Sequence, residues 1–329
     1  MCSLSQKPAE SKLKTCFSLG YKLTVVLLFW VCCMDIFLWD YTTLPLEQLR
    51  IIVAILGVSV GAYFDLFNNK NVPEIFLYSF LAIAFIVNLI AFDSTLSFYA
   101  IATAMFVFGA FYLLYKAGQI GGADVYIMAS IALLIPVQPS ISPFLSQSFF
   151  VQIPFMLNVI LVSGLSLMVY MLIRSIPIAI SSAKSKLKID NKSLFGCVAI
   201  IFAFATFCVI SSNLGVVPPT YLILVASLAI FSIYFTLFKD AINSTMIEWV
   251  DYRGVEPEDI IAVEKMDKQL IKDYSLSRLV DEAMHSRMKK ISGKKIAVYK
   301  HLPPFVPHIL IGLVFSILFG NVVLFFGGF

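Results

Sequence analysis

Two aspartates in a strongly apolar chain are spaced so that they could take part in one reaction. Asp65 ends the apolar run 51–64, and Asp124 follows the Gly-Gly-Ala run at 121–123. Two carboxyl groups held close together do not both ionise readily, so one keeps its proton while the other acts as a base on water. Such a pair could carry out aspartyl proteolysis.

The segments between the two aspartates predict that both lie at one membrane surface. Two apolar runs, 75–92 and 96–115, separate them in sequence. At ~1.5 Å per residue, each run is about long enough to cross a bilayer. Two crossings return the chain to the side that it left. We therefore expect Asp65 and Asp124 to lie at similar depth on the same face.

The composition excludes a soluble globular protein. Of the 329 residues, 60% are hydrophobic and 13% are charged, which is typical of a helical membrane protein. The predicted fold class is an all-α polytopic membrane protein with about nine transmembrane helices and one small cytoplasmic insert. The nine spans are 23–38, 51–64, 75–92, 96–115, 125–137, 149–173, 194–211, 221–237 and 305–326.

The distribution of charge predicts the orientation of these spans. With a cytoplasmic N-terminus, every basic residue except Arg50 falls on the cytoplasmic side, as the positive-inside rule requires. The fifth span is short, but a re-entrant loop there would move Arg174 and the lysines after it to the outside. We therefore expect a multi-pass protein of the cytoplasmic membrane, with both aspartates facing the cytoplasm.

Four regions follow from this count. They are a cytoplasmic N-terminal segment (1–22), a transmembrane catalytic domain with helices one to eight (23–238), a cytoplasmic soluble insert (239–303) and a C-terminal transmembrane helix (304–329). No small-x-small cleavage site follows the first apolar run, so an uncleaved anchor helix is expected there. Within the insert, an amphipathic helix is expected at 260–279 and a short strand at 293–299.

Other catalytic chemistries find little support in the sequence. The three histidines lie late in the chain, without an H-E-x-x-H motif or a nearby Ser or Cys motif. The six cysteines form no C-x-x-C pair, and we interpret them as packing residues rather than as a disulfide or zinc framework. We expect no metal and no cofactor.

The sequence resembles the Gly-x-Gly-Asp membrane aspartyl peptidases, in particular the archaeal prepilin and preflagellin peptidases. The residues that carry the resemblance are Gly121, Gly122, Ala123 and Asp124, then Asp65 with Val72 and Pro73 after it, and the late segment 303–307 before Ile311 and Gly312. Ala123 departs from the family pattern, which has a second glycine there. Glu74 follows Pro73 where many bacterial members have asparagine, and it is assigned no role.

The resemblance implies roles for these residues and a class of substrate. Asp65 and Asp124 would be catalytic, with the glycines, Ala123 and Pro73 in support. The substrate would be a prepilin or pre-archaellin precursor, whose short basic leader precedes a hydrophobic helix. The cysteine-rich insert that bacterial relatives associate with N-methylation has no counterpart, so peptidase activity without methyltransferase activity is expected.

The acidic side chains Glu256, Glu258 and Asp259 form the densest negative cluster predicted on the cytoplasmic side. They could bind the basic leader, although a merely solvated surface is an equal alternative. The expected partners are the precursor proteins and the lipid bilayer, and no nucleic acid.

Two other functions stay open. An ion-coupled transporter would need ionisable residues at the bilayer midplane, where these spans have almost none. The second is a non-catalytic membrane subunit of a pilus or archaellum assembly machine. Presenilin-type proteases share the aspartate motif but also use a Pro-Ala-Leu motif, which is missing here. Cleavage of a prepilin-like peptide, set against uptake assays, separates these functions.

Overall fold

The computed structural model describes residues 44–68, 71–140, 154–184, 191–214, 219–289 and 295–320. Ten α-helices dominate these ranges, together with one two-stranded sheet. The predicted N-terminal segment 1–22 and the anchor helix 23–38 lie outside the described residues. The helical membrane fold is thus confirmed in its coarse form.

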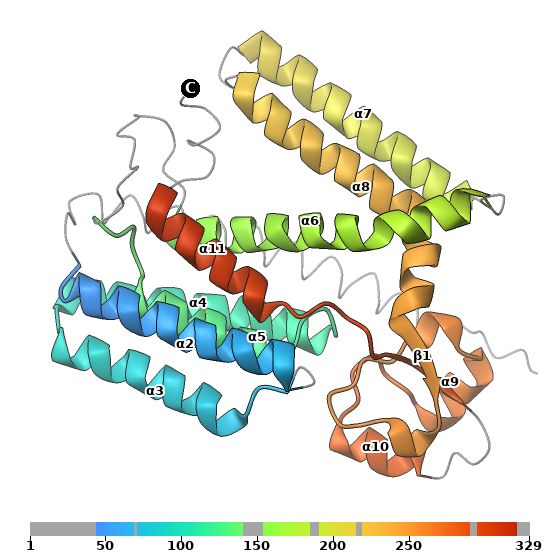
Figure 1. The fold of residues 1–329 in the computed structure, drawn as a ribbon, viewed down its shortest axis with the longest axis horizontal. Coiled ribbons are helices and arrows are strands. Elements are labelled where there is room, and N and C mark those ends of the chain that lie inside the picture. Colours follow the sequence, from blue (N-terminus) through green and yellow to red (C-terminus); the bar gives the residue numbers. More distant parts are fainter. Residues whose placement is uncertain are drawn as a thin grey trace, which may run out of the picture.

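Four helices form the first layer of the molecule (Figure 1). Each corresponds to one predicted apolar span, and α4 begins where the Asp93 side chain accepts a hydrogen bond from the Leu96 N–H at 2.9 Å. This side-chain cap satisfies one of the unpaired N–H groups of a helix start. The four helices are α2 (Glu47–Phe67), α3 (Glu74–Ile90), α4 (Ser94–Lys116) and α5 (Gly122–Leu134).

The remaining long helices cover this layer and extend beyond it. In Figure 1, α6 and α11 cross over the layer, whereas α7 and α8 pair with each other and lean away. The long α6 contains Pro177, and α8 continues past the predicted span to Met246. Their bounds are α6 (Phe155–Lys184), α7 (Asn191–Leu214), α8 (Pro219–Met246) and α11 (Val306–Phe319).

The structure tests only part of the predicted count of membrane-spanning helices, because the first predicted span lies outside the described residues. Within the described residues, five helices are long and apolar enough to cross a membrane: α2, α4, α6, α7 and α8. The apolar helices α3, α5 and α11 are shorter. The count of nine spans is therefore not confirmed.

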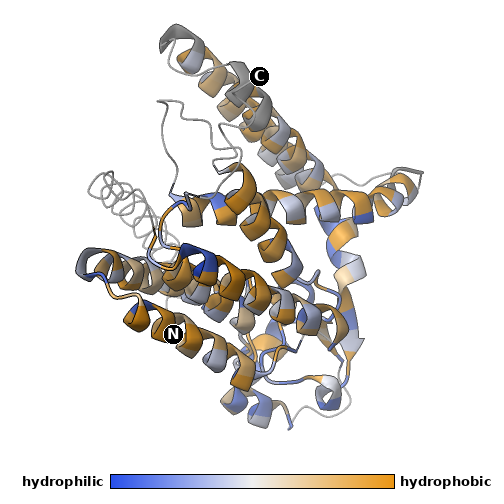
Figure 2. Cartoon of the chain, turned by 60° about the vertical axis from the view of Figure 1, so that its left-hand side comes forward, coloured by the Kyte–Doolittle hydropathy of each residue, from blue (hydrophilic) through white to orange (hydrophobic). Residues whose placement is uncertain are grey.

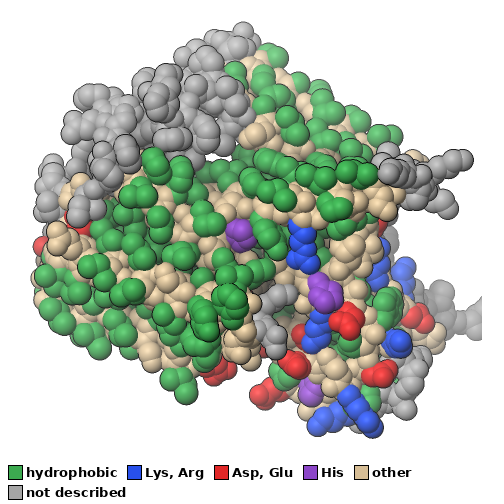
Figure 3. Space-filling view, in the orientation of Figure 1, with side chains coloured by type: hydrophobic (Ala, Val, Ile, Leu, Met, Phe, Trp, Pro, Cys, Tyr) green, Lys and Arg blue, Asp and Glu red, His purple; other side chains and the backbone are tan. Residues whose placement is uncertain are grey.

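The helical part exposes apolar side chains, as a lipid-facing surface does. Large hydrophobic residues such as Leu56, Ile86 and Phe202 are more than half-exposed. Figure 2 shows apolar residues along most of the helices, and Figure 3 shows charged side chains gathered instead over the insert. Contiguous apolar surface of this extent indicates contact with lipid.

The far end of α5 is held by two polar side chains. At 13 residues, α5 is only ~20 Å long and stops short of the ~30 Å hydrocarbon thickness. Its last carbonyl groups therefore need donors. Arg50 Nη1 donates to Leu134 O at 3.0 Å, and Asn88 Nδ2 donates to Leu133 O at 2.7 Å.

This network corrects the predicted position of Arg50. The sequence places Arg50 in an external loop, but it lies in α2 and is fully buried. Its guanidinium also donates to Asn88 Oδ1 at 3.0 Å and to Pro45 O at 2.9 Å. Because no sequence pattern links α2 to the end of α5, only the packed structure reveals this role.

Replacing Asn88 by leucine is expected to destabilise the bundle. Asn88→Leu removes the donor to Leu133 O and the acceptor of Arg50 Nη1, so two buried polar groups lose a partner at a cost of ~1–3 kcal/mol each. Thermal unfolding of the purified protein should show a lower midpoint. Ser130→Ala is the control, since the Ser130 hydroxyl bonds only within α5, to Tyr126 O. Equal midpoints for the two variants would contradict this reading of the network.

The insert is a small mixed unit with its own core. Strand β1 (Ile247–Val250) pairs antiparallel with β2 (Ile296–Tyr299), which confirms the predicted strand and adds a sheet to the expected all-α fold. Buried methionines and aliphatic residues fill its interior. The remaining elements are η1 (Tyr252–Gly254), η2 (Val263–Lys265), α9 (Lys268–Tyr274) and α10 (Glu282–Met288).

The predicted amphipathic helix at 260–279 is wrong. Ile260 and Ile261 form isolated antiparallel bridges with Leu279 and Val298 instead. Only α9 is an α-helix in this range, begun by the side chain of Asp267 and ended by Ser275 in the left-handed conformation. The apolar residues of the range therefore pack in an extended segment and a short helix around the sheet.

Candidate active site

Asp65 lies in the last turn of α2 and is held by the start of α11. Its side chain is buried, with 7% of the residue exposed. Its Oδ2 accepts a hydrogen bond of 3.0 Å from the backbone N–H of Val306. Val306 is the first residue of α11, where N–H groups have no partner within the helix and favour a negative charge. The late segment 303–307, singled out in the sequence, thus reaches the first aspartate.

Asp124 lies in the first turn of α5 and is also buried, with 5% exposed. Its Oδ2 accepts a hydrogen bond of 2.9 Å from the backbone N–H of Gly121. An acid at the third helical position that reaches back to the N-cap N–H is half of a capping box. The same contact therefore begins α5 and fixes the carboxyl group.

The structure brings the two aspartates together across α2, α5 and α11. The carboxyl groups of Asp65 and Asp124 are close enough to interact electrostatically. Gly61, one turn before Asp65 in α2, packs against α5 and α11. A Cβ there would lie 3.0 Å from Ile127 Cδ1 and 3.4 Å from Val306 Cγ1. The small residue lets the helices approach where the carboxyl groups meet.

The predicted supporting residues occupy helix starts. Gly121 is the N-cap of α5, and Gly122 and Ala123 are its first residues. Ala123 is partly buried against the apolar core, so its methyl group is accommodated where the family has glycine. Pro73 is the N-cap of α3, and its carbonyl accepts a hydrogen bond from Leu77 N–H at 3.2 Å.

The three acids of the insert have different surroundings. Asp259 forms a salt bridge of 2.6 Å with Lys300 and accepts a hydrogen bond from Glu256 N–H at 2.8 Å. Glu256 is exposed, while Glu258 accepts a hydrogen bond of 2.9 Å from the hydroxyl of Tyr115. Sequence reasoning missed Tyr115, because nothing in the sequence signals that α4 meets the insert.

A further polar pair joins α6 and α11. Ser166 Oγ lies 2.9 Å from His308 Nδ1, and His308 packs beside the ring of Tyr170. Within the described residues, no carboxylate is hydrogen-bonded to His308, so the pair lacks the third member of a catalytic triad. We interpret it as a contact between helices.

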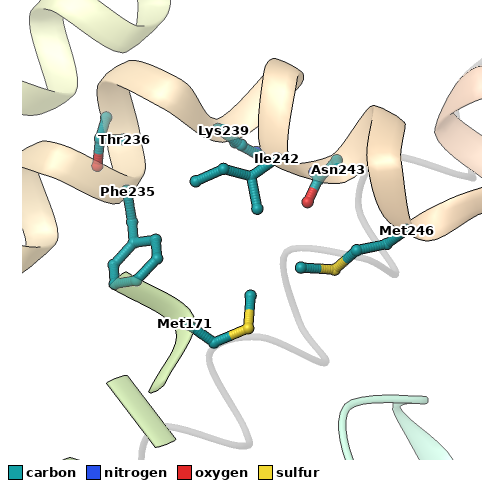
Figure 4. Close-up of a pocket in the computed structure, with 7 residues that line it drawn as sticks. All are labelled: Met171, Phe235, Thr236, Lys239, Ile242, Asn243 and Met246. Carbon is teal, nitrogen blue, oxygen red and sulfur yellow. The ribbon is translucent and has the colours of Figure 1, made fainter. Parts of the chain in front are cut away.

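A cavity in the described part of the chain is lined by neither aspartate. It has a volume of about 350 Å³ and lies between α6 and α8, lined by Met171, Phe235, Thr236, Lys239, Ile242, Asn243 and Met246 (Figure 4). Met171 comes from α6, and the other six come from α8. It offers no acid pair and no histidine. Among the described residues, no three His, Cys, Asp or Glu side chains come together as metal ligands.

Comparison with known proteins identifies one family. Residues 51–172 match the type IV leader peptidase family. Comparisons with curated proteins and with solved structures gave no significant match. The matched segment runs from α2 into α6 and carries both buried aspartates. Over residues 51–172 the chain is therefore similar to the type IV leader peptidase family, which confirms its resemblance to prepilin-type peptidases.

Proposed function

We propose that this protein is a membrane aspartyl endopeptidase that removes the short basic leader of prepilin or pre-archaellin subunits. The observation that carries the proposal is the meeting of Asp65 and Asp124 at one end of the helical layer, inside the segment that matches the family. Each carboxyl group has one oxygen bonded to a backbone N–H of a helix start. Both acids are thus oriented by backbone rather than by mobile side chains.

The pair supports hydrolysis of a peptide bond by water. One carboxylate takes a proton from a water molecule, and the oxygen of that water attacks the scissile carbonyl carbon. The protonated carboxyl group meanwhile donates a hydrogen bond to the carbonyl oxygen. The C–N bond then breaks as a proton passes to the leaving nitrogen. Because the two acids interact in a buried site, a single shared proton is the expected resting arrangement.

The surroundings of the site suit the junction between a leader and a membrane helix. The aspartates lie at the ends of α2 and α5 nearest the charged insert (Figure 1), and α2 exposes apolar residues such as Leu56 and Tyr63. A precursor could lay its hydrophobic helix along this surface and extend its leader toward the insert. The acids Glu256, Glu258 and Asp259 would then attract the basic leader, as complementary charges do.

The direct test is cleavage of precursors by the purified protein. Detergent-solubilised protein would be incubated with prepilin-like and pre-archaellin-like peptides, and mass spectrometry would detect the shortened product. A single cut between leader and hydrophobic segment is the expected result. Intact precursors, together with ion-driven uptake of a solute in proteoliposomes, would instead favour the transporter alternative.

The membrane side of the site has its own prediction. Because positive-inside counting puts the loop between α4 and α5 in the cytoplasm, a cysteine at the exposed Gln119 should resist an impermeant thiol reagent in sealed cells. It should react in inverted vesicles. The control is a cysteine at the exposed Ser94, at the opposite end of α4, which should show the reverse pattern. Both are made with the natural cysteines replaced, and labelling of Gln119→Cys from outside would contradict the orientation.

A further inference from the structure

A turn of the insert contacts the start of the helix that carries Asp124. The hydroxyl of Tyr115, near the end of α4, donates a hydrogen bond of 2.9 Å to Glu258 Oε1. A Cβ on Gly122 would lie 3.6 Å from Glu258 Oε2. The Glu258 carboxylate therefore lies against the first turn of α5, which also carries Asp124.

A second contact joins the insert to the same loop. Gly118 adopts a left-handed conformation, with φ +64°, and a Cβ there would lie 3.2 Å from Arg278 Cγ. Arg278 belongs to the segment that pairs with the Glu258 turn, since its carbonyl accepts a hydrogen bond from Ile261 N–H at 2.7 Å. The insert thus meets both ends of the loop between α4 and α5, and its position relative to Asp124 is fixed at two points.

The backbone directs the Glu258 side chain toward this loop. Glu258 has φ 73°, a conformation that residues other than glycine adopt only when their surroundings hold them there. Its N–H donates to Val280 O at 2.8 Å, and Val280 N–H donates to Asp259 O at 3.0 Å. Strained backbone at a residue that contacts a catalytic motif is typical of a functional position.

The Glu258 carboxylate is not used by the insert itself. Within the described residues, its one hydrogen bond comes from Tyr115, and the side chain is exposed. Asp259, by contrast, is bound to Lys300 inside the insert. Glu258 is hydrogen-bonded to α4 through Tyr115, and its carboxylate can still accept hydrogen bonds from an incoming cation.

We propose that Glu258 is the specificity-determining residue that binds the cationic side chain of the leader nearest the scissile bond, with Tyr115 orienting its carboxylate. The assignment rests on the proposed function. Gly122 and Asp124 are ~3 Å apart along the helix axis, and an extended peptide advances ~3.3 Å per residue. A lysine or arginine bound at Glu258 therefore belongs to a residue within a few positions of the bond that is cut.

The test measures how leader charge affects cleavage. Full-length protein in lipid nanodiscs is given precursors with a neutral leader, or with one lysine stepped through the last positions of that leader. The unmodified protein should prefer lysine at one position. Glu258→Gln should lower kcat/KM for that precursor by about 10- to 100-fold, as expected for a lost hydrogen bond between charged groups. It should barely change cleavage of the neutral leader.

Further variants separate recognition from folding. Glu258→Gly removes the carboxylate but relieves the left-handed backbone, so the insert should keep its stability and still lose the lysine preference. Glu258→Lys should cut a precursor with glutamate at the selected position better than one with lysine. Asp273→Asn, which removes an exposed acid of α9 in the same insert, is the matched control and should keep the preference.

Each remaining outcome counts against the assignment. A preference for lysine that survives Glu258→Gln and Glu258→Gly overturns it, and so does an equal fall for the lysine and neutral leaders. If the unmodified protein cuts all leaders equally well, this assignment fails while the proposed function stands. If it cuts no precursor, both fail.

Discussion

Asp65→Asn and Asp124→Asn are each expected to lower cleavage by roughly 10³-fold or more, because a positioned acid pair acts as a unit. Asparagine keeps the size of aspartate and retains an oxygen that can accept the hydrogen bond from Val306 or Gly121 N–H. It cannot exchange the proton that hydrolysis needs. The variants should therefore insert and unfold like the unmodified protein. The measurement is cleavage of a precursor by purified variants, with thermal unfolding recorded in parallel.

The matched control for these variants is Asp93→Asn. Asp93 is the N-cap of α4, at the end of that helix away from the Asp124 loop. Asparagine caps a helix as well as aspartate does. This variant should stay active. The double variant Asp65→Asn with Asp124→Asn should be no worse than either single one. Substantial turnover by a single variant would refute the aspartyl mechanism.

Gly312→Leu is expected to prevent correct packing of α11 and to abolish cleavage with it. Gly312 lies where α11 crosses α6, and a Cβ there would lie 2.1 Å from Ser163 Oγ, 2.7 Å from Val159 O and 2.9 Å from Ser163 N. Two of these atoms are backbone, so the helices themselves must separate. Since α11 begins at Val306, its displacement also removes the N–H that holds Asp65.

The smaller change Gly312→Ala gives a graded test. We expect it to destabilise the protein by about 1–3 kcal/mol, the usual cost of overpacking, with a partial loss of cleavage. Gly164→Ala is the control: Gly164 lies in α6 beside Ser163, and nothing lies within 4 Å of a Cβ there. That variant should match or slightly exceed the unmodified protein in thermal unfolding. A Gly312→Ala protein as stable as Gly164→Ala would show that α6 and α11 can separate at little cost.

Local pattern was enough to predict the helices of the first layer. Each predicted apolar run of this layer contains a helix: 51–64, 75–92, 96–115 and 125–137. Where apolar side chains face lipid or the core, water cannot bond the backbone, so its N–H and C=O groups must bond within the segment. The pattern was less informative about length. Helix α3 ends at Ile90 rather than at 92, and α11 ends at Phe319 rather than at 326, because apolar residues just beyond a helix end look the same in sequence as those within it.

Inside the insert, the sequence pattern predicted one strand correctly and one helix wrongly. The residues 260–279 have apolar spacing that suits an amphipathic helix, yet Ile260 and Ile261 pair with Leu279 and Val298. Such pairing depends on segments far apart in sequence. It therefore cannot be recovered from the periodicity of one segment.

The sequence by itself determined the class of this protein, an apolar helical chain whose two aspartates follow the pattern of a peptidase family, one near the end of a helix and one at the start of another. Composition and spacing carry that information because bilayer thickness fixes the length of a crossing. Only the tertiary structure decided what surrounds those acids. Val306 reaches Asp65 from the other end of the chain, Arg50 caps α5 from within α2, and Glu258 meets Tyr115 across the insert. These contacts join residues distant in sequence, and they exist only once packing has brought the helices and the insert together.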